Sequence, residues 1–285
     1  MYERIVVGTD LSETARVATD RAANLAGHLR AGLTLVHVGR DRQGAEALAE
    51  EYGAEAVVAN GNPADVLIDK ADELGADLLV VGSVGMRGAR RFLLGSVPNK
   101  VSHHAPADLL IVKTDPPPKE MGDYQKLMVG TDGSSTAMRA LDAACELAEA
   151  LSIAPLVVCA YEPLTEHEKE ILRADPNDVV AQWDADKSTR ETPEEFRWRI
   201  AGAKQAEDIL ERAVDHAGSC GIGADVRAVE GNPAEMLISI AEDEDFDLIV
   251  VGSVGMRGAK RFMLGNVPHR ISHHASTDVL ILKTV

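Results

Sequence analysis

The 285-residue chain is poor in cysteine, and this shortage limits what its thiols do. Cys145, Cys159 and Cys220 are its three cysteines, and their spacing is not that of a metal-binding motif. We therefore expect buried, reduced thiols in a cytoplasmic protein.

Cations are also scarce, and long apolar runs are lacking. The chain has 29 Lys and Arg against 46 Asp and Glu, a net charge of −17, which argues against a nucleic-acid partner. No apolar run approaches the roughly 20 residues that span a bilayer. The start, Met1-Tyr2-Glu3-Arg4, leads into an apolar stretch without a secretory signal. The expected location is the cytoplasm, with no membrane contact.

What the chain does have is an internal repeat. Residues 75–114 and 245–284 align without a gap, and 27 of the 40 paired positions are identical. We expect one domain at 1–114, a proline-rich linker at 115–125 and a second domain at 126–285. The offset between the copies is 122 at Asp10 and Asp132 but 170 at Gly82 and Gly252, so the second domain has an insertion at about 162–198. This insertion is either a lid or partner surface, or a mere surface excursion.

Apolar runs alternate with helical patterns in both copies, which predicts an α/β fold. Each domain is expected to be a doubly wound, five-stranded parallel sheet of order 3-2-1-4-5 with helices on both faces. In the first copy the predicted strands are 5–7, 33–38, 54–59, 77–81 and 108–113. The predicted helices are 13–29, 45–52, 63 onward with Asn62 as cap, and 97–104.

This strand order places a crevice where the first and fourth strands end. Asp10 follows the first strand and Gly82 ends the fourth, and Asp132 and Gly252 are their counterparts. We therefore expect a binding site at this edge in each domain. The aspartates either accept a ribose hydroxyl or cap the first helix through an Asx turn.

A glycine loop follows the fourth strand in both copies, with Gly82, Gly85 and Gly95 in the first. Glycines allow backbone amides to form an anion-binding nest, and Ser96 or its counterpart Asn266 stands where it can cap the next helix. Three cations lie in each loop, either neutralising a polyphosphate or simply solvated. They are Arg87, Arg90 and Arg91 in one copy and Arg257, Lys260 and Arg261 in the other.

The stretches Val7-Gly8-Thr9-Asp10, Gly61-Asn62-Pro63 and Gly82-x2-Gly85-x9-Gly95-Ser96 resemble the universal stress protein family, whose nucleotide-binding members carry Gly-x2-Gly-x9-Gly-Ser/Thr. The resemblance covers nearly all of both halves and implies a tandem member of the ATP-binding type, a stress-response sensor with little or no turnover. It implies ATP as the ligand, alone or with Mg²⁺. With the loop cations Arg87 and Arg257 added, the site residues of the first copy are Thr9, Asp10, Val38, Val81, Gly82, Gly85, Arg87, Gly95, Ser96 and Val97. Those of the second are Thr131, Asp132, Ala160, Val251, Gly252, Gly255, Arg257, Gly265, Asn266 and Val267.

Three alternatives to an ATP sensor stay open. The runs Leu94-Gly95-Ser96-Val97-Pro98 and Gly130-Thr131-Asp132-Gly133-Ser134 also resemble a subfamily that prefers cyclic AMP. A slow ATPase would hold Mg²⁺ at Asp10 or Asp132, although no Walker lysine follows either loop. A pure interaction scaffold would not need the glycines. Catalytic and metal residues are not assigned, and the paired histidines 103–104 and 273–274 are expected to be structural.

The resemblance also implies an assembly. Family dimers pair through the final strand, and here Leu109–Lys113 and Val279–Lys283 are expected to pair within one chain as a pseudo-dimer. Further association into a homodimer is expected as well.

Overall fold

A computed structural model describes residues 2–84, 94–114, 122–161, 194–254 and 264–283. The first half contains β1 (Arg4–Thr9), α1 (Glu13–Leu29), β2 (Gly32–Val38), α2 (Arg42–Glu51), β3 (Glu55–Ala59), α3 (Pro63–Glu73), β4 (Leu78–Gly82), α4 (Ser96–His104) and β5 (Asp108–Val112). The second contains β6 (Leu127–Gly130), α5 (Ser135–Leu151), β7 (Pro155–Tyr161), α8 (Glu194–Ser219), β8 (Asp225–Glu230), α9 (Pro233–Asp243), β9 (Leu248–Gly252), α10 (Asn266–His274) and β10 (Asp278–Leu282).

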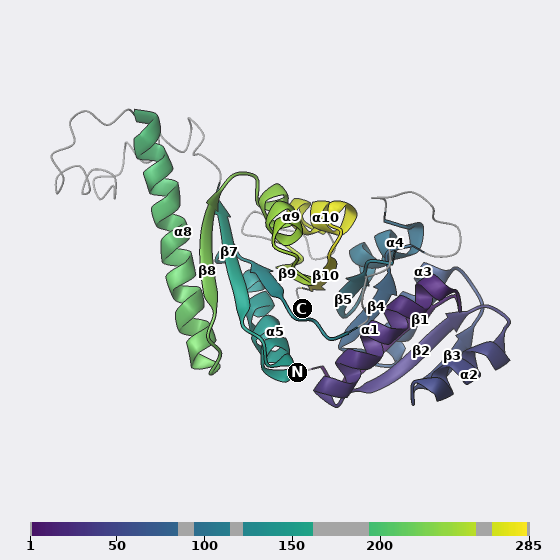
Figure 1. Cartoon of the computed structure of the whole chain (residues 1–285). Helices are drawn as coiled ribbons and strands as arrows, with labels where there is room; N and C mark the ends of the chain where they lie inside the picture. Colours follow the sequence, from purple (N-terminus) through teal and green to yellow (C-terminus); the bar gives the residue numbers. More distant parts are fainter. Residues whose placement is uncertain (1, 85–93, 115–121, 162–193, 255–263, 284–285) are drawn as a thin grey trace.

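The strands form a ten-stranded sheet in the order β3-β2-β1-β4-β5-β10-β9-β6-β7-β8 (Figure 1). The first five strands are parallel and follow the predicted order 3-2-1-4-5, and the last five repeat it in mirror order. The halves join where β5 and β10 run antiparallel, with Leu110 opposite Leu280. The predicted pairing of the final strands is therefore present, and it fuses two five-stranded sheets into one.

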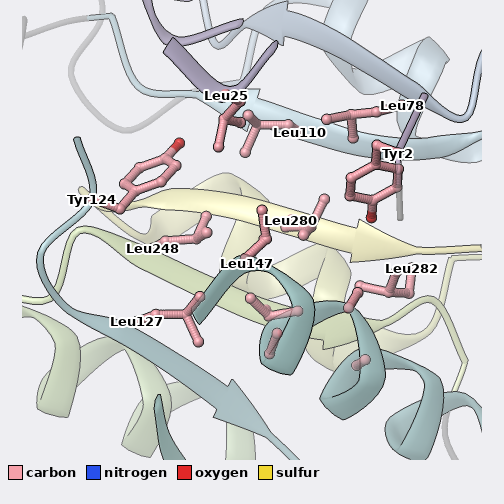
Figure 2. Packing of buried hydrophobic residues seen from close by; sticks show 14 of the residues in the cluster. Tyr2, Leu25, Leu78, Leu110, Tyr124, Leu127, Leu147, Leu248, Leu280 and Leu282 are labelled. Atoms are coloured by element: carbon pink, nitrogen blue, oxygen red, sulfur yellow. The ribbon is translucent and has the colours of Figure 1, made fainter. Parts of the chain in front are cut away.

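Helices cover both faces of this sheet, which is why its central strands β4, β5, β6, β9 and β10 are almost wholly apolar, whereas the edge strand β8 carries three charged residues. Alternate strand residues pack on opposite sides: Ile5 and Val7 lie in one cluster and Val6 in the other. The first cluster is covered by α1, α2, α5 and α8, and the second by α3, α4, α9 and α10. Each cluster runs through both halves. Figure 2 shows Leu110 and Leu280 meeting in the first cluster, between Leu25 and Leu147.

The helices begin where their capping residues predict. The Ser12 hydroxyl accepts from the Ala15 amide at 3.2 Å, and Ser134 accepts from Ala137 in the same way. Asn62 accepts from the Ala64 amide at 3.1 Å, with Pro63 in the first turn. These bonds satisfy amides that a helix start leaves without a partner, so local sequence sets these boundaries.

One boundary differs from expectation, at the end of the predicted insertion. The predicted insertion 162–198 falls mostly outside the described residues, but α8 already begins at Glu194 and continues to Ser219. Although α8 has 26 residues, the helices within the described part of the chain are not long and apolar enough to cross a membrane.

Candidate functional site

In each half, the predicted site residues of the first and fourth strands meet at the carboxyl ends of that half's parallel strands. Val7 of β1 pairs with Val80 of β4, so Thr9 and Gly82, each two residues further on, end their strands at the same level. Val129 and Val250 pair in the same way and place Thr131 level with Gly252. Each half thus brings together two segments that are far apart in sequence.

A threonine and an aspartate organise the turn after β1. The Thr9 hydroxyl accepts from the Leu11 amide at 3.1 Å, and the Asp10 Oδ1 atom accepts from the Ser12 amide, also at 3.1 Å. The second copy repeats both bonds, from Gly133 to Thr131 at 3.2 Å and from Ser134 to Asp132 at 3.0 Å. The aspartates therefore form Asx turns, one of the two roles expected for them. A metal bound at Asp10 would have to use Oδ2 or displace the turn.

The glycine loop is closed at its base. The Gly95 amide donates to the Ser83 carbonyl at 2.8 Å, and Gly265 donates to Ser253 at 2.7 Å. A Cβ atom on Gly95 would lie 3.2 Å from the Ser83 oxygen, so glycine permits this close approach. The middle of each loop, with Gly85, Gly255 and the six cations at 87, 90, 91, 257, 260 and 261, lies outside the described residues.

The helices after the loops start differently from the prediction that Ser96 and Asn266 cap them. Gly95 and Gly265 occupy the cap positions, and Ser96 and Asn266 are the first helical residues, both exposed. A glycine cap has no side chain to accept from the first amides, whereas the cap of α1 is the hydroxyl of Ser12. The starts of α4 and α10 therefore present amides and the positive end of the helix dipole at the strand-end edge.

The apolar residues predicted for the site are partly covered. Val81 and Val251 are buried at 2% and 3% exposure. Their side chains therefore belong to the core beneath the site and have little surface left to contact a ligand. The residues left half-buried are Val38, Val97, Ala160 and Val267.

Two residues at this edge were missed by the sequence analysis. The buried His37 lies opposite Thr9 in the sheet, with its Nδ1 atom 3.1 Å from the Thr9 carbonyl oxygen. Cys159 follows Val158, which pairs with Gly130, and so takes the equivalent place in the second copy. Burial, with Asp132 nearby, raises the pKa of the Cys159 thiol to about 11, which keeps it protonated at neutral pH. Only the strand register reveals this equivalence, because a lone histidine and a lone cysteine carry no motif.

A separate cavity of about 370 Å³ lies where the halves meet, between the amino end of β5 at Asp108 and the carboxyl end of β10 at Leu282. Its charged lining consists of Asp77, Asp108, Arg139, Asp142, Glu146 and Lys283. Four carboxylates against two cations make it a poor place for a polyphosphate.

The fold and the paired loops define a duplicated, doubly wound α/β protein with equivalent switch-point edges in its two halves. The sequence model of the universal stress protein family matches residues 1–55, 40–113 and 123–283. The chain belongs to this family.

The chain is also similar to individual relatives. A universal stress protein of Mycobacterium tuberculosis is 31% identical over 165 residues, which is 58% of this chain and 99% of the relative. The solved structure of a universal stress protein from Archaeoglobus fulgidus has a TM-score of 0.64 at 18% identity, covers 98% of both chains and so shows the fold alone. A universal stress protein solved in complex with cAMP is 29% identical, covers 57% of this chain and 100% of its own, and has a TM-score of 0.39.

Proposed function

We propose that the chain is a regulatory protein that binds ATP at the carboxyl edge of each half, with little or no turnover. Residues 1–114 and 126–285 are the two binding units. The observation that carries the proposal is the start of α4 and α10 at Gly95 and Gly265, beside the ends of β4 and β9. Uncapped helix amides at a switch point suit a phosphate group.

The rest of each edge supports a nucleoside. Asp10 and Asp132 hold carboxylates at the strand ends, where a ribose hydroxyl would donate. Val38 and Ala160 lie on β2 and β7, the strands next to β1 and β6, and are half-buried. Their exposed apolar surface could contact the adenine base. Little or no turnover is proposed because no Walker lysine follows either glycine loop to act on the phosphates.

The test begins with the small molecule that copurifies with the full chain, identified by mass spectrometry. Intact ATP supports the proposal; ADP with phosphate release supports a slow ATPase, and cyclic AMP a cyclic-nucleotide sensor. Calorimetry of the nucleotide-free chain should then give two ATP molecules per chain. A chain that binds no adenine nucleotide would contradict the proposal and leave the scaffold alternative.

Glycine variants locate the two sites. Gly95→Ala and Gly265→Ala each place a methyl group 3.2 Å from a loop carbonyl and should each abolish one site. Gly27→Ala and Gly218→Ala are the matched controls, because a Cβ atom at either position meets nothing within 4 Å. Both controls should keep two sites.

A further inference from the structure

Three potential metal ligands from two helices meet at the far edge of the second half. Asp142 lies on α5, His216 on α8, and Cys220 directly follows α8. The His216 Nε2 atom contacts the Asp142 Oδ1 atom, and one ligand atom from each of the three residues lies within 4.8 Å of the others. Cys220 is exposed, contrary to the expectation of a buried thiol.

The fold explains why these residues meet. The Cys220 amide donates to the carbonyls of His216 and Ala217 at 3.2 and 3.0 Å, so helical geometry continues one residue beyond α8. His216 and Cys220, four residues apart, therefore share one side of the helix. The apolar face of α8, including Ala213, packs in the same core cluster as α5 and brings that side towards Asp142.

The geometry fits a zinc ion. Zinc binds carboxylate oxygen, imidazole nitrogen and thiolate sulfur at about 2.0–2.3 Å in a tetrahedron, which sets the ligand atoms roughly 3.3–3.8 Å apart. The three ligand atoms lie within 4.8 Å of one another, about 1 Å beyond the upper end of that range. The side chains of His216 and Asp142 are 33% and 50% exposed, which leaves access for the ion and a water as fourth ligand. A thiolate and an imidazole favour zinc over magnesium or calcium.

We propose that Asp142, His216 and Cys220 form a zinc site that fastens α8 to α5. It lies towards the amino ends of the second half's strands, because β8 begins there after α8 ends, and so is remote from the proposed nucleotide site at the carboxyl ends of those strands (Figure 1). A bare ion pair is the simpler arrangement, and His28 with Asp123 provides one at 2.9 Å without a thiol. Cys220 distinguishes the Asp142–His216 pair from the His28–Asp123 pair, because it adds a third potential metal ligand.

Cys145 of α5 is a neighbour of this site rather than a ligand. Its side chain is in the core at 2% exposure, and burial, with Cys220 nearby, raises the pKa of its thiol to about 11. A Cys145–Cys220 disulfide is the competing use of Cys220. Experiments in a phosphine reductant distinguish the zinc site from the disulfide, because the reductant breaks the disulfide and leaves the three ligand side chains able to bind metal.

The test uses the full reduced chain without nucleotide, so that it is independent of the proposed function. Cobalt(II) should bind and give a thiolate-to-metal absorption band in the near ultraviolet, and one equivalent of zinc should displace it. Cys220→Ala should abolish the band, and His216→Ala or Asp142→Asn should weaken zinc binding at least tenfold in competition with a chelator dye. The band reports cysteine ligation alone, so histidines elsewhere do not confuse the result.

Matched variants are Cys159→Ala, which removes a buried thiol on β7, and His28→Ala, which breaks the plain ion pair. Both should keep the band and the zinc affinity. Circular dichroism without metal should show Cys220→Ala folded, since that side chain is exposed. A reduced wild-type chain without the band, or a Cys220→Ala chain that keeps it, overturns the proposal.

Discussion

The Asp278 carboxylate at the start of β10 accepts a hydrogen bond from the Lys113 amide just beyond β5, at 2.7 Å. Asp108 accepts from the Lys283 amide at 2.8 Å, so the same bond occurs twice across the antiparallel seam. A tyrosine hydroxyl donates to each carboxylate as well, Tyr124 to Asp278 at 2.8 Å and Tyr2 to Asp108 at 3.0 Å. The seam is therefore held by a repeated polar contact as well as by apolar packing.

Asp278→Ala should destabilise the whole chain. Asp278 also pairs with Arg21 at 3.2 Å, and both side chains are only 7% exposed. Burial raises the pKa of Asp278, whereas Arg21 and the hydrogen bonds act the other way. Removing the carboxylate leaves a buried guanidinium without its counter-charge, a loss of about 3–5 kcal/mol in unfolding free energy. Denaturant unfolding measures this, with the exposed Asp69→Ala as a control expected within about 0.5 kcal/mol of wild type.

Stability should fall between pH 7 and pH 5 because of two histidines beside the seam. His103 of α4 and His273 of α10 both flank His269, with ring centroids 6.0 and 4.4 Å from it. Burial lowers the pKa of both, helped by neighbouring histidines and by Lys283 and Lys113 respectively. The unfolded chain thus takes up protons first as pH falls through the ordinary value of about 6.5, so acid favours unfolding.

Thermal unfolding against pH tests this titration. A His103→Gln/His273→Gln chain should lose less stability than wild type over that interval. His274→Gln, at an exposed position on α10, should keep the wild-type slope. Equal slopes in all three chains would exclude these histidines as the cause.

Gly133→Ala should cost about 1–2 kcal/mol, because Gly133 has φ +76° and a side chain there is strained. Its Cβ atom would also lie 3.1 Å from Ile209 of α8. The first copy places Leu11 at φ +63° in the same turn and packs its side chain on the core, which offsets that strain. Gly218→Ala, inside α8 with open space around it, should instead stabilise by about 0.5–1 kcal/mol. Denaturant unfolding distinguishes these opposite signs.

Asp10→Asn and Asp10→Ala should separate the two roles of this residue. Asparagine still accepts from the Ser12 amide, so the turn and the stability should persist. The NH2 group that replaces Oδ2 cannot accept from a ribose hydroxyl, so a charge-assisted hydrogen bond worth about 1.5–3 kcal/mol is lost and ATP affinity at the first site should fall tenfold or more. Alanine should lower both stability and affinity. Calorimetry measures the ATP affinity and thermal unfolding measures the stability of the same samples. Unchanged ATP affinity in Asp10→Asn would mean that Asp10 serves the turn alone.

Asn266→Ser should strengthen the second nucleotide site, and Ser96→Asn should weaken the first. Both residues open their helices and are exposed at the proposed phosphate position, where the bulkier amide crowds the ligand. A change of roughly threefold to tenfold, about 0.7–1.4 kcal/mol, is expected by calorimetry. Measuring Asn266→Ser in a Gly95→Ala background isolates the second site. If neither substitution changes the ATP affinity, residues 96 and 266 do not cause a difference in affinity between the two sites.

Much of the fold and part of the site were predictable because they depend on near neighbours. The apolar run Ile5-Val6-Val7 predicts a strand buried on both faces, and Asn62 with Pro63 predicts the start of α3. The convergence of Thr9 with Gly82 follows from strand order alone. The cap position of α4 was not predictable at single-residue precision, because Gly95 and Ser96 both suit a helix start and only the bond from Gly95 to Ser83 distinguishes them.

The duplication, the α/β alternation and the glycine loops follow from the order of residues alone, since each is encoded in contiguous residues or in a repeat visible by alignment. The folded structure was needed to show that the two sheets become one where Leu110 lies opposite Leu280, and that His37 and Cys159 occupy equivalent positions. It alone brought Asp142 to Cys220. These relationships depend on how strands register and helices pack across long sequence separations, and no local propensity encodes a contact between residues that meet only after the chain has folded.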